Sequence, residues 1–129
     1  MATSIRSAHV GLSHARSLIP TPDGGHAATL LQRGSLNLKL SLPVPPNRQS
    51  PHAQDELYLV VTGHGVLVHD GQRTRFEPGD VMFVAAGVEH HFEDFSPDLA
   101  VWVVFYGPEG GEESVVRSPS ESKRQEPSA

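Results

Sequence analysis

Two imidazoles and one carboxylate are the groups in this sequence with the clearest capacity for chemistry. His52 precedes Glu56 by four residues, and His90 follows a Gly79-Asp80 turn later in the chain. Neutral imidazole nitrogens and a carboxylate oxygen can occupy one face of an octahedral metal ion or three corners of a tetrahedral one. Such a set leaves positions open on the ion, as metal catalysis requires. The residue types therefore indicate one divalent metal ion at a catalytic centre.

The composition restricts both the fold and the class of partner. The chain has 129 residues, of which 37% are apolar, and this suits one domain with one core. Eleven prolines and twelve glycines lie between short apolar runs, so they predict many turns and an all-β fold. Ten basic residues against fifteen acidic ones give a net charge of −5 without a basic stripe. We therefore expect no nucleic-acid partner.

The absence of cysteine and the composition of the N-terminal segment limit the possible metal ligands and the expected location of the protein. Cysteine is absent, so a bound metal must be held by nitrogen and oxygen atoms. Residues 1–20 contain two arginines and two histidines and lack the continuous apolar stretch of a signal peptide or membrane span. We therefore expect a cytoplasmic protein that does not associate with a membrane.

Short apolar runs between turn residues predict a series of strands. The expected strands cover residues 27–32, 36–42, 57–62, 66–69, 72–76, 81–84, a segment that includes 90–92, and 101–106. Asp70-Gly71 predicts a tight hairpin between two of them. Four leucines at alternate positions from Leu36 to Leu42 predict a strand with one buried face, which is either plain core or a surface paired across a dimer. An uncovered apolar sheet favours a homodimer.

The last strand is apolar on both faces, as expected for a strand between the interior and another layer. Trp102 and Tyr106 share one face, whereas Val101, Val103 and Phe105 share the other. Periodicity alone leaves open which of the two sets faces inward.

Three segments with different properties divide the chain. Residues 1–25 are small and polar with scattered aliphatics, which predicts an arm packed on a sheet. Residues 26–109 hold the predicted strands and form the domain. Residues 110–129 are rich in Glu, Ser, Gly and Pro and cannot bury enough apolar surface to offset ordering entropy, so we expect a disordered tail.

Two motifs resemble those of the cupin superfamily. The first cupin motif, G-x5-H-x-H-x3-E-x6-G, matches His52, Glu56 and Gly63, with Ser50 at its first histidine position. The second, G-x5-P-x-G-x2-H-x3-N, aligns with glycines at 79 and 87 and with His90, while Ala85 and Asp94 replace its proline and asparagine. The resemblance covers about residues 26–107, and its two motifs in order are more specific than a single pattern.

The resemblance implies a double-stranded β-helix, or jelly-roll barrel, with one metal ion near its centre. It implies His52, Glu56 and His90 as ligands of iron, zinc or manganese. Ser50 departs from the pattern, because a hydroxyl is a poor ligand for these metals beside imidazole. The site has therefore lost one strong donor, or that position passes to water, to Gln54 or to substrate.

Strand periodicity predicts which side chains accompany the metal ligands. Tyr58 and Val60 share the face of Glu56, and Phe92 shares that of His90, so these three should line a substrate pocket. Ser50 and Gln54 are the polar pocket candidates, and Tyr58 is a candidate proton donor. Asp55 is expected to be exposed, and His91 should point outward because it neighbours His90 on a strand.

The sequence supports three interpretations of this site. The first is a small metalloenzyme, dioxygenase-like or isomerase-like, that acts on a small oxygenated organic molecule. The second is a barrel that binds or senses a small molecule without catalysis and has lost part of its metal site, which the residues at positions 50 and 85 favour. The third is a structural barrel in which His52, Glu56 and His90 only bond to one another.

Overall fold

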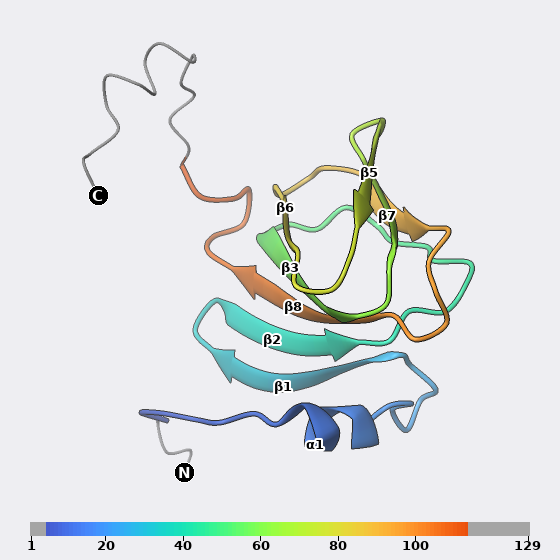
Figure 1. Cartoon of the computed structure of the whole chain (residues 1–129). Helices are drawn as coiled ribbons and strands as arrows, with labels where there is room; N and C mark the ends of the chain where they lie inside the picture. The colour runs from blue at the N-terminus through green and yellow to red at the C-terminus, as the bar shows by residue number, and fades with distance from the viewer. Residues whose placement is uncertain (1–4, 114–129) are drawn as a thin grey trace, which may run out of the picture.

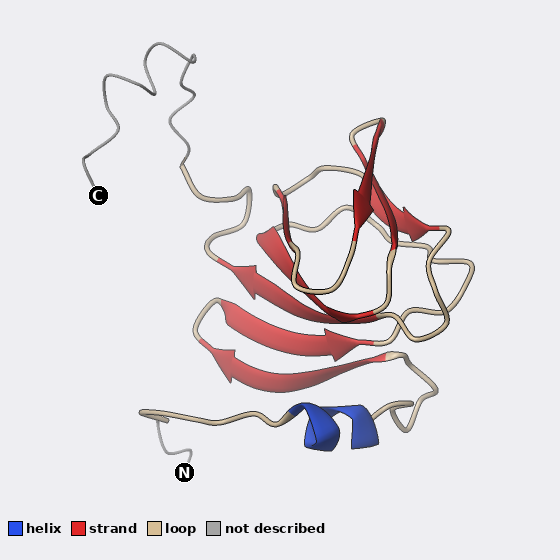
Figure 2. Ribbon diagram, in the orientation of Figure 1, coloured by secondary structure: helices blue, strands red, loops and turns tan. Residues whose placement is uncertain are grey.

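A computed structural model of the protein describes residues 5–113. Within that range the chain forms one short helix and eight strands (Figures 1 and 2). The elements are α1 (Leu12–Ser17), β1 (Ala27–Arg33), β2 (Leu36–Ser41), β3 (Asp55–Thr62), β4 (Gly65–His69), β5 (Gln72–Phe76), β6 (Val81–Val84), β7 (His90–Glu93) and β8 (Ala100–Tyr106). Each predicted strand is present, with bounds that shift by two residues or less.

The strands form two antiparallel sheets that face each other in a jelly-roll arrangement. One sheet has the order β1-β2-β8-β3-β6 and the other has the order β5-β4-β7. The all-β prediction is therefore confirmed. The predicted hairpin is present, because Asp70 and Gly71 both have positive φ angles, of 49° and 77°, as a type I′ turn requires.

Gly63 carries the chain from one sheet to the other. Its φ angle is +88°, and a Cβ at this position would lie 2.6 Å from the Cα atom of Leu99. Glycine meets both requirements because it has no Cβ and tolerates positive φ. The last glycine of the first motif is thus explained by backbone crowding rather than by chemistry.

The core lies between the two sheets and contains the inward residues of the last strand. Val101 and Val103 are buried there beside Tyr58 and Phe92. Register settles the question that periodicity left open, since Tyr58 pairs with Val103 and shares its face. Trp102 therefore lies on the outer face of the five-stranded sheet.

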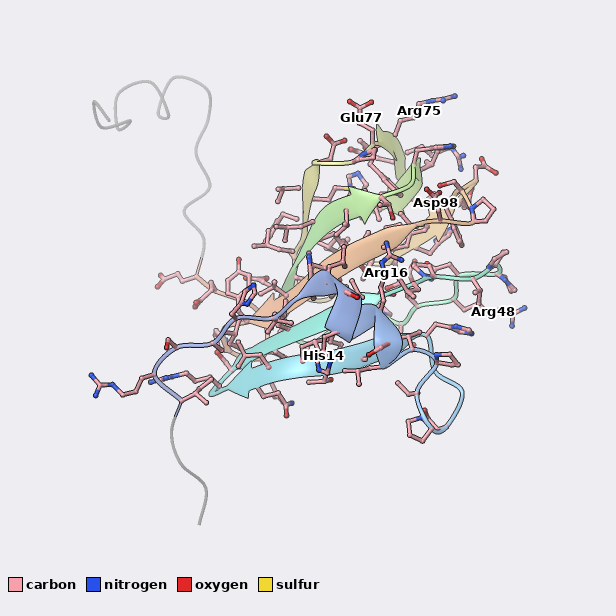
Figure 3. All side chains as sticks on the ribbon, turned by 60° about the horizontal axis from the view of Figure 1, so that its bottom comes forward. His14, Arg16, Arg48, Arg75, Glu77 and Asp98 are labelled. Atoms are coloured by element: carbon pink, nitrogen blue, oxygen red, sulfur yellow. The ribbon has the colours of Figure 1, made fainter. Side chains whose placement is uncertain are left out.

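The leucine stripe of β2 faces away from this core. The prediction that these leucines belong to the core between the sheets is therefore wrong. Lys39 pairs with the inward residue Val103, so Leu38 and Leu40 lie on the outer face. Leu40 is nevertheless fully buried. The helix α1 lies across this face of the sheet (Figure 3). Leu40 belongs to an outer apolar layer, and polar side chains of β2 point into the interior.

The N-terminal arm contributes the helix that covers this layer. Ala15 of α1 has no exposed surface, and Arg16 donates a hydrogen bond to the Thr62 hydroxyl at 3.4 Å. The arm thus contains a helical element that its polar composition did not predict. α1 has six residues, so the described part of the chain holds no helix that could cross a membrane.

The predicted C-terminal tail begins too early at residue 110. The Gly110 amide donates to the Ala53 carbonyl at 2.7 Å, and the Glu112 amide donates to the Asp55 carboxylate at 2.9 Å. Residues up to 112 are therefore bonded to the barrel. The remainder of the predicted tail, 114–129, lies outside the described residues.

Candidate metal centre

Three segments bring the candidate ligands together inside the barrel. His52 lies just before β3, Glu56 lies on β3 and His90 begins β7. Their ligand atoms all lie within 4.8 Å of one another. Glu56 Oε1 is 3.0 Å from His90 Nε2 and 3.6 Å from His52 Nε2. The structure thus gathers the three residues that the motifs selected.

A backbone bond joins the two motif segments. The Gly87 amide of the second motif donates to the carbonyl of His52 at 2.8 Å. This bond holds the irregular segment before β3 against the loop that leads to His90. Because Pro51 precedes His52 and disfavours a regular ladder, such a tie compensates for missing strand pairing.

The tautomer of His90 directs its second nitrogen toward the other ligands. Nδ1 lies 2.9 Å from the carbonyl oxygen of Val88, which can only accept, so Nδ1 carries a hydrogen. In the neutral ring Nε2 then has a free lone pair. This arrangement, a ligating histidine whose other nitrogen donates to a carbonyl, is the one found at metal centres.

A chain of side chains sets the hydrogen of the Tyr58 hydroxyl. The backbone N–H of Phe92 donates to Asn47 Oδ1 at 2.8 Å, and the same oxygen accepts Gln49 Nε2 at 2.7 Å. Gln49 must therefore present its oxygen to Tyr58, whose hydroxyl donates to it at 3.1 Å. The Tyr58 hydroxyl also lies 3.1 Å from His90 Nε2, with its lone pairs turned toward that ring.

Acceptor atoms consequently converge on one point without a donor. His52 Nε2 and Glu56 Oε1 are buried and have no hydrogen-bond partner. Buried polar atoms without partners are costly. A proton on His90 Nε2 would satisfy Glu56 alone, whereas a divalent cation would satisfy both imidazoles and the carboxylate together. The residues present therefore fit a metal ion.

The surroundings shift the pKa values of the two imidazoles in opposite directions. Burial lowers the pKa of His52, although the Glu56 carboxylate opposes this shift. Burial also acts against the charged form of His90, but the Glu56 carboxylate and the Val88 carbonyl outweigh it and raise its pKa. Burial, reinforced by Glu56, raises the pKa of Tyr58 well above the phenol range. Tyr58 is therefore a neutral phenol.

A cavity of about 210 Å³ opens beside the three ligands. Its polar wall comes from β2 and from the loop between β2 and β3, and its apolar wall comes from β1, β7 and β8. Besides the ligands and Tyr58, the lining residues are Ala27, Lys39, Ser41, Asn47, Gln49, Phe92, Val103 and Phe105. The predicted pocket residues Tyr58 and Phe92 both belong to this lining.

The other predicted pocket residues lie elsewhere. Ser50 is exposed and does not line the cavity, whereas its neighbour Gln49 does. The Gln54 amide donates to the carbonyls of Ser35 and Gly107, so it joins strand ends away from the site. Val60 is buried in the core and does not reach the cavity surface.

Sequence reasoning missed four polar residues of the lining. Lys39 and Ser41 alternate with the leucines of β2, so the opposite assignment of faces would have found them. Asn47 and Gln49 come from a proline-rich loop that has no period to interpret. Their amide chemistry was the only signal available.

Asp55 also differs from its prediction as an exposed residue. It is only 6% exposed and accepts the backbone amides of Ala86 and Glu112 at 3.0 and 2.9 Å. These two bonds lower the pKa of its carboxyl group, that of Glu112 most. Asp55 thus joins β3, the loop before β7 and the segment after β8, while its neighbour Glu56 faces the interior.

A larger hollow of about 550 Å³ lies over β4 and β5 and contains none of the three ligands. Its wall is charged, and Arg73 is already paired there with Glu93 and Asp94. The smaller cavity is the candidate functional site, because the unpartnered acceptor atoms of His52 and Glu56 lie in its wall.

Comparison with known proteins identifies the family. The family model described as the cupin domain matches residues 42–106, a segment that includes all three candidate ligands. This chain belongs to the cupin family. The predicted resemblance is thus confirmed, and the jelly-roll fold is that of the family.

This cupin is similar in sequence to two curated relatives and in structure to a solved cupin. It is 40% identical over 88 residues to an uncharacterized protein of Streptomyces coelicolor. This alignment covers 67% of this chain and 84% of the relative. It is 36% identical over 50 residues to acireductone dioxygenase of Bacillus subtilis, covering 35% of this chain and only 28% of that enzyme. A cupin 2 conserved barrel protein from Salinispora arenicola superposes with a TM-score of 0.59 at 20% identity, over 83% of this chain and 91% of that one.

Proposed function

We propose that this cupin is a small metalloenzyme that holds one divalent ion of iron, zinc or manganese through His52, Glu56 and His90. Its substrate is a small oxygenated organic molecule that enters the cavity beside the ion. The observation that carries this proposal is the convergence of buried acceptor atoms on one point, with two of them unpartnered. The segment similar to a dioxygenase supports chemistry of the dioxygenase type, and isomerisation is the second reaction class.

His52, Glu56 and His90 would hold the ion, which when bound would supply Lewis-acid chemistry toward a substrate oxygen. The chain's own residues shape the site around it. Phe105 packs edge-on against the His52 ring, with ring centroids 4.7 Å apart, and thereby holds the orientation of that imidazole. Tyr58 donates to Gln49, and burial raises its pKa so that its proton is hard to release, and we therefore assign it a positioning role in place of the predicted proton donor.

A barrel that binds or senses a small molecule without catalysis is the alternative function. Two features favour it: the serine at the first histidine position of the motif, and the exposure of that serine. Such a protein would use the same cavity but would not require an ion for binding. Metal content therefore separates the two functions.

The test is elemental analysis of protein purified without chelators and without an affinity nickel column. We expect about one equivalent of iron, zinc or manganese in the wild type and a loss of most of it in Glu56→Gln, because that change removes the ligand charge. Glu93→Gln is the matched control. Glu93 lies on β7, but its carboxylate pairs with Arg73 of β5, away from the ligands. Absence of metal from the wild type after reconstitution would favour the non-catalytic barrel.

A further inference from the structure

Lys39 places a positive charge on the wall of the cavity. It lies on β2 opposite Val103 of β8, and both face the interior. Its Nζ atom is 5.9 Å from the centroid of the Phe105 ring, which itself packs against the His52 ring. The ammonium group therefore stands beside the candidate metal ligands.

This ammonium group has no counterion among residues 5–113. None of the ion pairs in that range involves Lys39. Glu56 is the one carboxylate in the cavity wall, and it faces both imidazoles. A half-buried charge without a partner is unfavourable unless something pairs with it when the site is in use.

The charge of the site contrasts with that of the protein. With a divalent ion held by the three ligands, Lys39 and the single carboxylate of Glu56 would leave the cavity with two net positive charges. The whole chain, by contrast, carries a net charge of −5. A general basic surface does not account for such a cavity, whereas an anionic ligand would neutralise it.

We infer that the ligand of this cavity is a small carboxylic acid whose carboxylate pairs with Lys39 and whose neighbouring hydroxyl or oxo oxygen is directed toward the metal ligands. The inference deepens the proposed function and rests on it for the role of the second oxygen. The cavity of about 210 Å³ suits such a molecule, because its volume equals that of roughly seven waters. Phe92 and Phe105 offer apolar contacts to its carbon atoms.

The test compares two probes of similar shape and different charge, pyruvate and its neutral amide, pyruvamide. Each is titrated calorimetrically into the full-length protein, with and without added zinc. We expect the wild type to bind pyruvate at least about tenfold more tightly than pyruvamide, which corresponds to one charge-assisted contact. Lys39→Met should abolish this preference, and Lys39→Arg should retain it.

Arg75→Met is the matched control, because Arg75 projects from β5 outside this cavity (Figure 3). It should leave the preference unchanged, and Lys39→Met should not reduce metal content. Equal preference in Lys39→Met and wild type would overturn the inference, as would a wild type that does not distinguish the probes. A Lys39-dependent preference in a protein that binds no metal would support the carboxylate site while contradicting the proposed metalloenzyme.

A measurement on the wild type covers the case in which Lys39→Met does not fold. The chain contains two lysines, Lys39 and Lys123, so reductive methylation with ¹³C-formaldehyde gives few NMR signals and preserves the lysine charge. The Lys39 signal, assigned by its absence in Lys39→Arg, should shift with pyruvate and remain in place with pyruvamide. A Lys39 signal that ignores pyruvate would contradict the inference.

Discussion

The side-chain oxygen of Asn47 accepts the backbone N–H of Phe92 at 2.8 Å and thereby ties the proline-rich loop before β3 to the strand that carries His90. The same oxygen orients Gln49, which in turn receives the Tyr58 hydroxyl. A backbone amide of β7 thus determines the direction of a hydroxyl beside the metal ligands.

Asn47→Ala should weaken zinc binding by about tenfold to a hundredfold, the usual cost of losing an outer partner of a metal site. Asn47→Asp keeps an acceptor oxygen for both donors and should retain the affinity of the wild type or exceed it. Competition with a chromogenic chelator measures both variants. Equal weakening in the two would mean that the amide oxygen has no orienting role.

Ser50→His distinguishes the family pattern from the geometry of this chain. The pattern predicts that a histidine at position 50 completes a four-ligand site. The structure predicts no gain, because Ser50 is exposed and the cavity wall at this point is formed by Gln49. We therefore expect unchanged zinc affinity in Ser50→His. A tenfold or larger gain would show that position 50 turns inward when metal binds.

A chain truncated after Glu109 should be less stable than a chain truncated after Glu113. The shorter chain loses the amides of Gly110 and Glu112, which donate to Ala53 and Asp55. Loss of these bonds should lower the free energy of unfolding by about 1–2 kcal/mol. Thermal denaturation should then show a decrease of roughly 4–8 °C per kcal/mol between the two truncated chains. Identical melting curves would mean that residues 110–113 add no stability.

The homodimer predicted from the sequence has a candidate surface on the edge strand β6. Val81 and Phe83 are 61% and 53% exposed there, beside Leu59 of β3 at 38%. We propose that a second copy of the chain covers this patch, since uncovered apolar sheet edges favour association. Light scattering should give twice the monomer mass for the wild type and the monomer mass for Phe83→Lys. Val44→Lys, which alters another exposed apolar residue, should leave the dimer intact.

Local rules were enough to predict the strands and the Asp70-Gly71 hairpin, whereas the grouping of His52 with Glu56 and His90 came from the resemblance to the cupin motifs. Turn chemistry acts over two residues, and alternation acts along a single strand, so neither depends on the rest of the fold. The motif spacing adds the expectation that two distant segments meet in one barrel.

Only the tertiary structure decided which face of β2 is the interior. Alternation states that Leu40 and Lys39 point in opposite directions, but it cannot choose between them when both sides of the sheet are covered. In the folded chain Leu40 is buried on the outer face, and Lys39 lines the cavity. In the irregular loop before β3, no period relates neighbouring residues, so the choice of Gln49 over Ser50 depends on bonds to Asn47 and Tyr58 from elsewhere in the chain.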